Sequence, residues 1–226
     1  MKEKLVYFVR HGQSTANGTG VFQGGDSTLT DLGKRQAAFV AKRFKDLQTD
    51  SILSSPMPRA LETAQAIAHT TGAPLETHEV FREYLPPTSL IGARMDTDEG
   101  RAYTEALREH YEEPGWHYAD EDSYFDLHER ACAALDLLEA SAHTKIAVVS
   151  HAGFMRVLFT AMLSKREPDP RTARRLARFL LPENTGITVC RYRPQETKRN
   201  VWRMITWNDH AHLGATDKAE PVESQM

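Results

Sequence analysis

Short apolar runs alternate along this chain with longer segments whose apolar residues recur at helical spacing. The clearest run is KIAVVS at residues 145–150, and similar runs lie at 5–9 and 51–55. Between the last two, LTDLGKRQAAFVAKRFKDL has apolar residues three and four apart, with Thr30 as its N-cap. Strands that alternate with helices are typical of helices covering a mostly parallel sheet. We therefore predict an α/β fold, a three-layer α/β/α sandwich with a mostly parallel central sheet.

The other predicted elements follow the same alternation. In chain order they are a helix opened by Pro58 and ended by Gly72, an extended segment 74–83, a helix near 103–112, a helix at 124–142, a helix from Gly153, and a closing antiparallel pair at 186–192 and 201–207. A chain of 226 residues is long enough for one domain with a sizeable core. We assign that domain to residues 1–208, with 85–123 as a lid or insertion and 209–226 as a polar tail.

Composition excludes several classes of partner. A net charge of −3 does not favour a nucleic-acid binder, and we interpret the basic stretch RTARRLARF as one solvated helix face. The N-terminal apolar run is too short for a signal peptide or a membrane span, so we expect a cytoplasmic protein. Cys132 and Cys190 fall in a helical and a strand pattern, which favours two buried free thiols over a bridge.

Reactive side chains follow several of the predicted strands. Arg10 and His11 end the first strand, Arg59 follows the second, and His151 ends the run at 145–150. Glu83 lies at the end of the extended segment 74–83. Because ligands of open α/β sheets bind at the carboxyl ends of the strands, we expect these five side chains to share one rim.

Two arginines and two histidines on one rim are suited to phosphate chemistry. Guanidinium groups offer paired donors to a tetrahedral dianion, and we expect helix starts near Gly12 and Gly153 to add backbone N–H groups. One neutral imidazole can attack phosphorus, the other can donate to the phosphoryl oxygens, and a glutamate can protonate the departing oxygen. The residues alone therefore predict a phosphoryl-transfer site.

Four motifs, RHGQSTAN, FQGGDSTLTDLGKRQA, SILSSPMPRALETA and VVSHAGFMR, closely resemble the histidine phosphatase superfamily, which includes the cofactor-dependent phosphoglycerate mutases. The resemblance runs in order over residues 5–206 and implies a phosphoglycerate mutase-like fold. It implies that His11 is the nucleophile that becomes phosphohistidine and that Glu83 is the proton donor. It further implies that the phosphoryl group is held by Arg10, Arg59, His151, Asn17 and the N–H of Ala152, with Gln23 at the mouth of the site.

The segment after Glu83 bears on the reaction. Mutases of this family resemble one another in a tyrosine- and glycine-containing stretch at that place. The stretch of this chain, YLPPTSLIG, does not look like it. We therefore favour a phosphatase acting on a small phosphomonoester, and we keep a phosphoglycerate mutase-type isomerase and a non-catalytic phosphate-binding module as alternatives. Apart from the substrate, the partner that the sequence leaves possible is a second copy of the chain, in a homodimer.

Other phosphate chemistries are excluded by inspection. The sequence has no G-x-x-x-x-G-K-[ST] loop, no cysteine followed six positions later by arginine, and no G-x-S-x-G elbow. The remaining histidines lack metal-ligand spacing, and no C-x-x-C motif occurs. We therefore expect neither a metal nor a cofactor.

Overall fold

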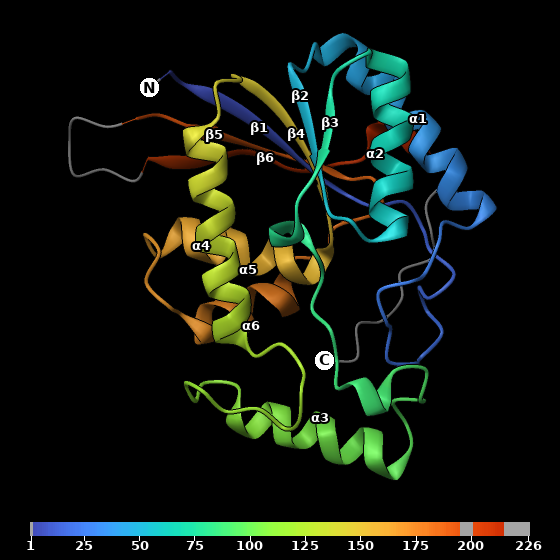
Figure 1. The fold of residues 1–226 in the computed structure, drawn as a ribbon, viewed down its shortest axis with the longest axis vertical. Helices are drawn as coiled ribbons and strands as arrows, with labels where there is room; N and C mark the ends of the chain where they lie inside the picture. The colour runs from blue at the N-terminus through green and yellow to red at the C-terminus, as the bar shows by residue number, and fades with distance from the viewer. Residues whose placement is uncertain (1, 195–200, 215–226) are drawn as a thin grey trace.

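The computed structural model describes residues 2–194 and 201–214, which form a six-stranded sheet with helices on both faces (Figure 1). The strand order is β3-β2-β4-β1-β5-β6. The strands are β1 (Lys4–Arg10), β2 (Ser51–Ser54), β3 (Leu75–Thr77), β4 (Lys145–Ser150), β5 (Ile187–Tyr192) and β6 (Trp202–Asp209). The first four strands are parallel to one another, while β5 is antiparallel to β1 and β6 to β5. The predicted α/β sandwich with a mostly parallel sheet is therefore confirmed.

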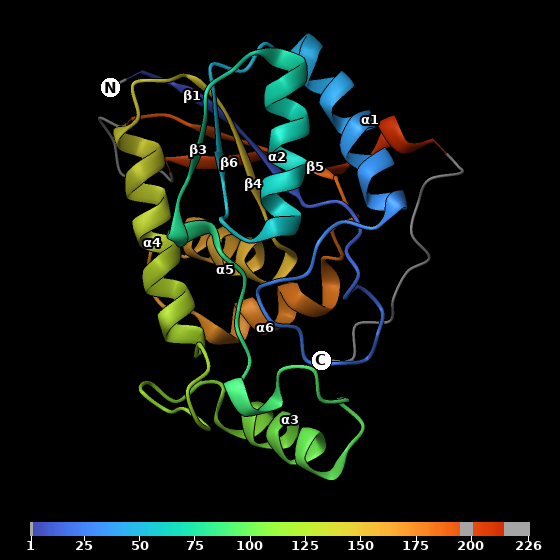
Figure 2. The ribbon, with the colours of Figure 1, turned by 45° about the vertical axis from the view of Figure 1, so that its right-hand side comes forward.

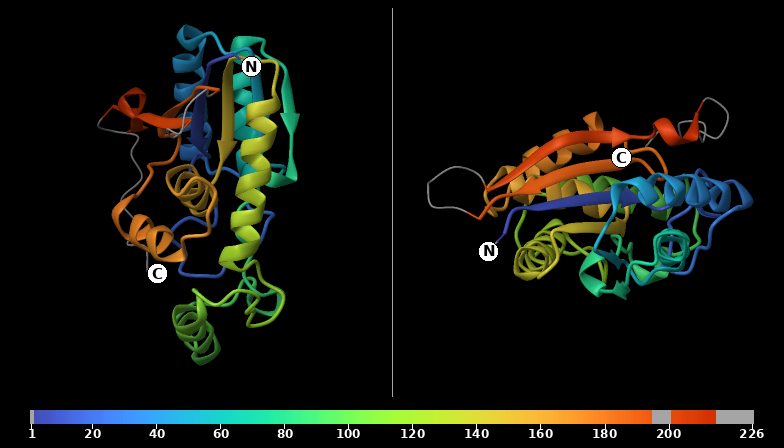
Figure 3. Two further views of the ribbon diagram at one scale, coloured as in Figure 1. Left: turned by 90° about the vertical axis from the view of Figure 1, so that its left-hand side faces the viewer. Right: turned by 90° about the horizontal axis from the view of Figure 1, so that it is seen from above.

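The helices divide between the two faces according to the alternation of side chains along the strands. Their bounds are α1 (Asp31–Leu47), α2 (Pro58–Thr71), α3 (Asp98–His110), α4 (Tyr124–Ala140), α5 (Ala152–Leu163) and α6 (Pro170–Phe179). Val6 and Phe8 of β1 belong to the core cluster that contains α4 and α5, whereas Tyr7 and Val9 belong to the cluster that contains α1 and α2. The view from above shows the sheet between these two helical layers (Figure 3).

The helix boundaries follow local signals in the sequence. The hydroxyl of Thr30 accepts a hydrogen bond from Gly33 N at the start of α1, as an N-cap does. Pro58 occupies the first turn of α2, and Gly72 ends that helix with φ 73°, a left-handed conformation that glycine adopts without strain. These signals were sufficient to predict both helices.

Two predicted elements are wrong in detail. No helix begins at Gly12; the chain leaves β1 as a loop that lies against the first turn of α1, where a Cβ at Gly12 would be 2.6 Å from Gly33 O. The extended segment predicted at 74–83 is a strand only over Leu75–Thr77, because a 3₁₀ turn over Glu79–Phe81 interrupts it. Glu83 therefore follows a turn and not a strand.

Residues 85–123 lie beyond the carboxyl ends of the strands, where α3 runs across the foot of the molecule (Figure 2). Leu90 and Tyr103 of this segment form a small buried cluster with Phe22 of the loop after β1. Backbone hydrogen bonds join it to the loop after β1, from Phe22 N to Ala93 O at 3.0 Å and from Gly92 N to Phe22 O at 2.9 Å. We call residues 85–123 together with this loop the outer wall.

The predicted tail at 209–226 begins inside the fold. Asp209 ends β6, and a 3₁₀ turn over Ala211–Leu213 buries Leu213; residues 215–226 lie outside the described residues. Both cysteines are free, Cys190 buried and Cys132 half-buried, so only Cys132 departs from the prediction. Among the residues described, none of the helices combines the length and apolar character needed to cross a membrane.

Candidate active site

The carboxyl ends of β1 and β4 and the first turn of α2 bring four of the predicted residues together. The rings of His11 and His151 lie with their centroids 5.0 Å apart, and Arg59 Nε is 3.3 Å from His11 Nε2. His11 is 5 % exposed, Arg59 2 % and His151 fully buried. Arg10 directly precedes His11 at the end of β1, and its positive charge acts on both imidazoles, so one site holds two imidazoles and two guanidiniums.

Two hydrogen bonds fix the tautomer of His11. Its Nδ1 lies 2.7 Å from Gly12 O, and because a carbonyl oxygen only accepts, Nδ1 carries the proton. Arg59 Nε donates to His11 Nε2, which is therefore the unprotonated nitrogen. Burial, together with the positive charges of Arg59 and Arg10, lowers the pKa of His11 well below its usual value. The imidazole is neutral, and its Nε2 lone pair accepts the hydrogen bond from Arg59.

His151 is also held as a neutral imidazole. Its Nε2 lies 2.8 Å from the hydroxyl of Ser55, while its Nδ1 is buried with no hydrogen-bond partner among the residues described. Burial, and after it the neighbouring His11 ring and the positive charge of Arg59, lower the pKa of His151 well below its usual value. An unpartnered buried nitrogen is costly unless a bound group satisfies it.

The two guanidiniums are anchored by neutral groups and not by carboxylates. Arg59 donates to Gly25 O at 3.3 Å and to the hydroxyl of Ser27 at 3.0 Å, and Arg10 donates to Pro182 O at 2.6 Å. Burial lowers the pKa of Arg10 to about 10, which still leaves it charged near neutral pH. In the described part of the chain neither guanidinium forms an ion pair, so the site carries positive charge suited to an anion.

Glu83 is bound to the first turn of α5. Its Oε1 accepts hydrogen bonds from Phe154 N at 2.7 Å and Tyr84 N at 3.0 Å, and its Oε2 accepts from Gly153 N at 3.0 Å. Gly153 is required for this approach, because a Cβ there would lie 2.7 Å from Glu83 Oε1. The carboxylate is therefore fixed beside His151, the N-cap residue of α5.

The other predicted residues are positioned less directly. Asn17 uses its Oδ1 within its own loop, accepting from Ser14 N at 2.7 Å and from the Ser14 hydroxyl at 3.0 Å. Gln23 donates from Nε2 to Ala16 O at 2.5 Å, so it too braces this loop. Ala152 is the first residue of α5, and the next two amides of that turn bind Glu83.

One supporting segment was missed by sequence reasoning. Residues 180–186 return from α6 to β5 past the end of β1, and Asn184 Nδ2 donates to His11 O at 2.8 Å. Thr185 N donates to Arg10 O at 2.9 Å, and Thr185 adopts φ 60°. The only sequence signal is the turn-forming NTG triplet before β5, which indicates a turn but not its role.

The described residues contain no group of three or more histidine, cysteine or acidic side chains that could hold a metal ion. The positive charge in the site comes from arginine side chains.

Comparison with known proteins identifies the family of the chain. Residues 6–210 match the model of the histidine phosphatase superfamily, branch 1. A probable phosphoglycerate mutase GpmB of Yersinia pestis is 31% identical over 212 residues, 92% of this chain and 94% of that protein. A putative phosphoserine phosphatase 2 of Hydrogenobacter thermophilus is 30% identical over 164 residues, 69% of this chain and 76% of that protein.

Solved structures share the fold. A mutant phosphoserine phosphatase from Entamoeba histolytica, in complex with phosphoserine, gives a TM-score of 0.73 at 26% identity and covers 93% of this chain and 99% of its own. A mycobacterial glucosyl-3-phosphoglycerate phosphatase gives a TM-score of 0.72 at 22% identity, covering 92% of this chain and 99% of its own. The match of the family model over nearly the whole described fold shows that the chain belongs to the histidine phosphatase superfamily.

Proposed function

We propose that this protein is a metal-independent phosphatase that hydrolyses a small phosphomonoester through a phosphohistidine on His11. The observation that carries this proposal is the fixed tautomer of His11. Gly12 O holds the Nδ1 proton, which leaves the Nε2 lone pair beside the guanidinium of Arg59. A neutral imidazole held next to an anion-binding group is a nucleophile prepared for a phosphoryl group.

In the first step the Nε–H of Arg59 turns from His11 Nε2 to a phosphoryl oxygen, and Nε2 attacks phosphorus as the ester P–O bond breaks. The electron pair of that bond leaves with the alkoxide, which takes a proton from Glu83 and departs as a neutral alcohol. Phosphorylation leaves the imidazole positively charged, and the hydrogen bond from Nδ1 to Gly12 O stabilises that charge. The products are an alcohol and a phosphohistidine.

In the second step water attacks the phosphohistidine. Glu83, now a carboxylate, accepts a proton from that water as the new P–O bond forms and the N–P bond breaks. The electron pair of the N–P bond returns to Nε2, and inorganic phosphate leaves. Because α5 backbone amides fix both Glu83 oxygens, the same carboxyl group is in place for both transfers.

Charge stabilisation is the role we assign to the remaining site residues. Arg10 and Arg59 hold the phosphoryl oxygens and take the part that a divalent metal plays elsewhere. His151 presents its unpartnered Nδ1, and Ala152 contributes the first-turn N–H of α5 that Glu83 leaves free. Asn17 and Gln23 act at the mouth through the loop they brace.

The main alternative is a mutase that returns the phosphoryl group to a second hydroxyl. The relationship to a probable phosphoglycerate mutase supports it, whereas the phosphoserine phosphatase relatives and the stretch YLPPTSLIG after Glu83 support hydrolysis. We favour hydrolysis because that stretch, which has one tyrosine and one glycine, does not resemble the glycine-rich run expected of a mutase. A non-catalytic phosphate-binding module is disfavoured by the complete pair of imidazoles.

Turnover of phenyl phosphate with and without a chelator tests the proposal. We expect full activity after chelation, and a protein quenched in alkali during turnover should carry an acid-labile, base-stable phosphate on His11. Interconversion of 3- and 2-phosphoglycerate dependent on 2,3-bisphosphoglycerate, and faster than phosphate release, would instead establish the mutase. Activity lost on chelation and restored by Mg²⁺ or Zn²⁺ would overturn metal independence.

A further inference from the structure

Arg156 is a buried arginine that the phosphoryl-transfer scheme does not use. It lies in the second turn of α5 and is only 4% exposed. Its Nε donates to Leu180 O at 3.1 Å, and no carboxylate in residues 2–194 or 201–214 forms an ion pair with it. A guanidinium is rarely buried without an anionic partner, because desolvating its charge costs several kcal/mol.

Position along α5 places Arg156 beside the reaction centre. Residues three and four apart share a helix side, so Arg156 shares one with Gly153 and Ala152, and long side chains on a helix lean toward its N-terminus. Arg156 and Glu83 are close enough for the carboxylate to raise the pKa of the guanidinium, although burial lowers it overall. The positive charge of Arg156 in turn contributes to the lowered pKa of Arg10.

Arg156 and Arg10 are anchored to the same stretch of backbone. Leu180 O accepts from Arg156 and Pro182 O accepts from Arg10 at 2.6 Å. The two carbonyl groups lie two residues apart in the connection between α6 and β5. The two guanidiniums are therefore held by one short segment of backbone, close enough for the charge of Arg156 to act on Arg10.

Tyr111, which belongs to the outer wall, offers a neutral hydrogen-bond donor near Arg156. It follows α3, packs against Tyr124 with ring centroids 5.4 Å apart, and has the guanidinium of Arg174 4.7 Å above its ring. Burial raises the pKa of Tyr111, so its hydroxyl stays protonated. Arg156 acts electrostatically on this same tyrosine.

We propose that Arg156 binds a carboxylate of the substrate, so that the enzyme selects phosphomonoesters of small carboxylic acids. This inference rests on the proposed phosphatase function. The planar fork of a guanidinium matches the two oxygens of a carboxylate, and the single charge of Arg156 balances a monoanion. Arg10 and Arg59 are left for the phosphoryl dianion, and the hydroxyl of Tyr111 donates a further hydrogen bond to the carboxylate.

Pairs of similar substrates, one with a carboxylate and one without, test this contact. O-phosphoserine is compared with O-phosphoethanolamine, and 3-phosphoglycerate with glycerol 3-phosphate. Wild type should favour the acid of each pair, and Arg156→Ala should lower that preference in kcat/KM by about 10–100-fold, as expected for a hydrogen bond to a charged group. Arg156→Lys keeps the charge but loses the planar guanidinium, so its preference for the acid should lie between those of wild type and Arg156→Ala.

Controls separate this loss from general damage. Arg175→Ala removes an exposed arginine from the neighbouring helix α6 and should leave the preference unchanged. Thermal melting and phenyl phosphate turnover show whether each Arg156 variant is folded and active. Because the readout is a ratio within each substrate pair, a uniform loss of activity does not move it.

Two outcomes distinguish the inference from the function on which it rests. If wild type hydrolyses phenyl phosphate and Arg156→Ala keeps the wild-type ratio in both pairs, the carboxylate site is wrong while the phosphatase stands. If wild type has no phosphatase activity on any of these esters, the proposed function itself fails. A wild type that prefers the esters without a carboxylate would also overturn the inference.

Discussion

The site has two walls of different construction, and under the proposed function one wall serves the chemistry and the other the choice of substrate. The first wall lies at the carboxyl ends of β1 and β4 and the start of α2, and we call it the sheet edge. There His11, His151 and Arg59 are nearly inaccessible and are held by strands and a helix of the main core. The outer wall has a core of only three buried side chains, and its ion pairs Arg94–Asp96 and Arg101–Asp98 are solvent-exposed. Exposed pairs of this kind contribute at most about 1 kcal/mol each.

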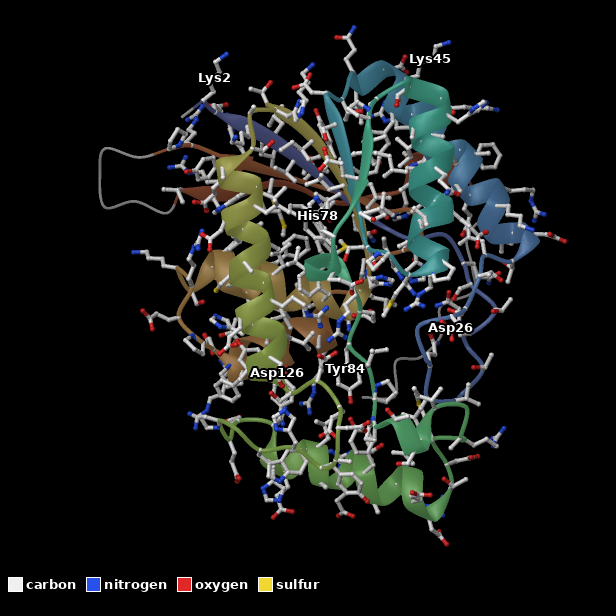
Figure 4. All side chains as sticks on the ribbon, in the orientation of Figure 1. Lys2, Asp26, Lys45, His78, Tyr84 and Asp126 are labelled. Carbon is white, nitrogen blue, oxygen red and sulfur yellow. The ribbon has the colours of Figure 1, made fainter. Side chains whose placement is uncertain are left out.

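Groups that must hold a reacting atom in place therefore come from the sheet edge. The outer wall can change shape or sequence without disturbing them, which suits a surface that selects substrates. In Figure 4 the labelled Tyr84 lies between the strand ends and α3, and it packs against both the main core and the outer-wall cluster. Substitutions should accordingly affect all substrates at the sheet edge and act unequally at the outer wall.

The largest effect is expected for His11→Ala. Removing the nucleophile should reduce turnover of every phosphomonoester by about 10⁴-fold or more, as for other covalent catalysts. Phosphate release from phenyl phosphate and the alkaline quench measure it. His69→Ala, at an exposed position near the end of α2, is the matched control and should behave as wild type. Near-normal turnover by His11→Ala would remove the basis of the mechanism.

Glu83→Gln comes next, and its effect should depend on the leaving group. An alkyl phosphate leaves as a strongly basic alkoxide unless it is protonated, so we expect a loss of about 10²–10⁴-fold there. Nitrophenolate leaves without a proton, so its release step should hardly change. A burst of nitrophenolate followed by slow turnover would show that the second step still needs the carboxylate.

Equal losses on both esters, or none, would identify another carboxylate as the acid, and the exposed Asp26 would then be tested first. Gly153→Ala offers a second check, because its Cβ would displace Glu83 without removing the acid. It should reproduce the leaving-group dependence of Glu83→Gln in weaker form. A wild-type profile in this variant would mean that the position of Glu83 is unimportant.

Sequence patterns predicted the sheet edge far better than its supports. Arg10, His11, Arg59 and His151 could be placed because each follows a strand or begins a helix, and the ends of parallel strands converge. The supports from residues 180–182 act through backbone carbonyls, which every residue carries, so no side-chain pattern reveals them. The absence of a helix at Gly12 depends on packing against α1, which periodicity does not contain.

Arg59→Lys is the next smaller test of the sheet edge. A lysine keeps the charge but cannot donate to His11, Gly25 and Ser27 from one planar group. We expect a loss of about 2–4 kcal/mol in transition-state binding, seen in both KM and kcat. Steady-state kinetics on two unlike phosphomonoesters should give the same factor for both. An unchanged rate would place Arg59 outside the reaction.

Asp122→Asn should have the smallest effect, because it loosens the outer wall without touching the reacting atoms. Asp122 accepts from Arg82 at 2.6 and 2.7 Å and from Leu85 N at 3.0 Å, joining the two ends of residues 85–123. Losing this partly buried pair should lower the free energy of unfolding by about 1–3 kcal/mol. Thermal melting measures that change.

On the activity side, Asp122→Asn should raise KM by a factor that differs between substrates. Asp96→Asn, at an exposed pair within the same wall, is the matched control and should change neither quantity measurably. An equal loss of kcat on every ester would show instead that the outer wall contributes to the chemistry. The contrast between the two walls would then not hold.

The anchoring of the site by residues 180–186 has a consequence for folding. Arg10 is separated by 172 residues from the carbonyl that holds it, and His11 by 173 from Asn184. Such distant contacts close late, and the N-terminal part of a chain leaves the ribosome first. His11, the proposed nucleophile, is thus synthesised well before the segment that orients it, and a growing or truncated chain that ends before Leu180 holds this histidine without that support.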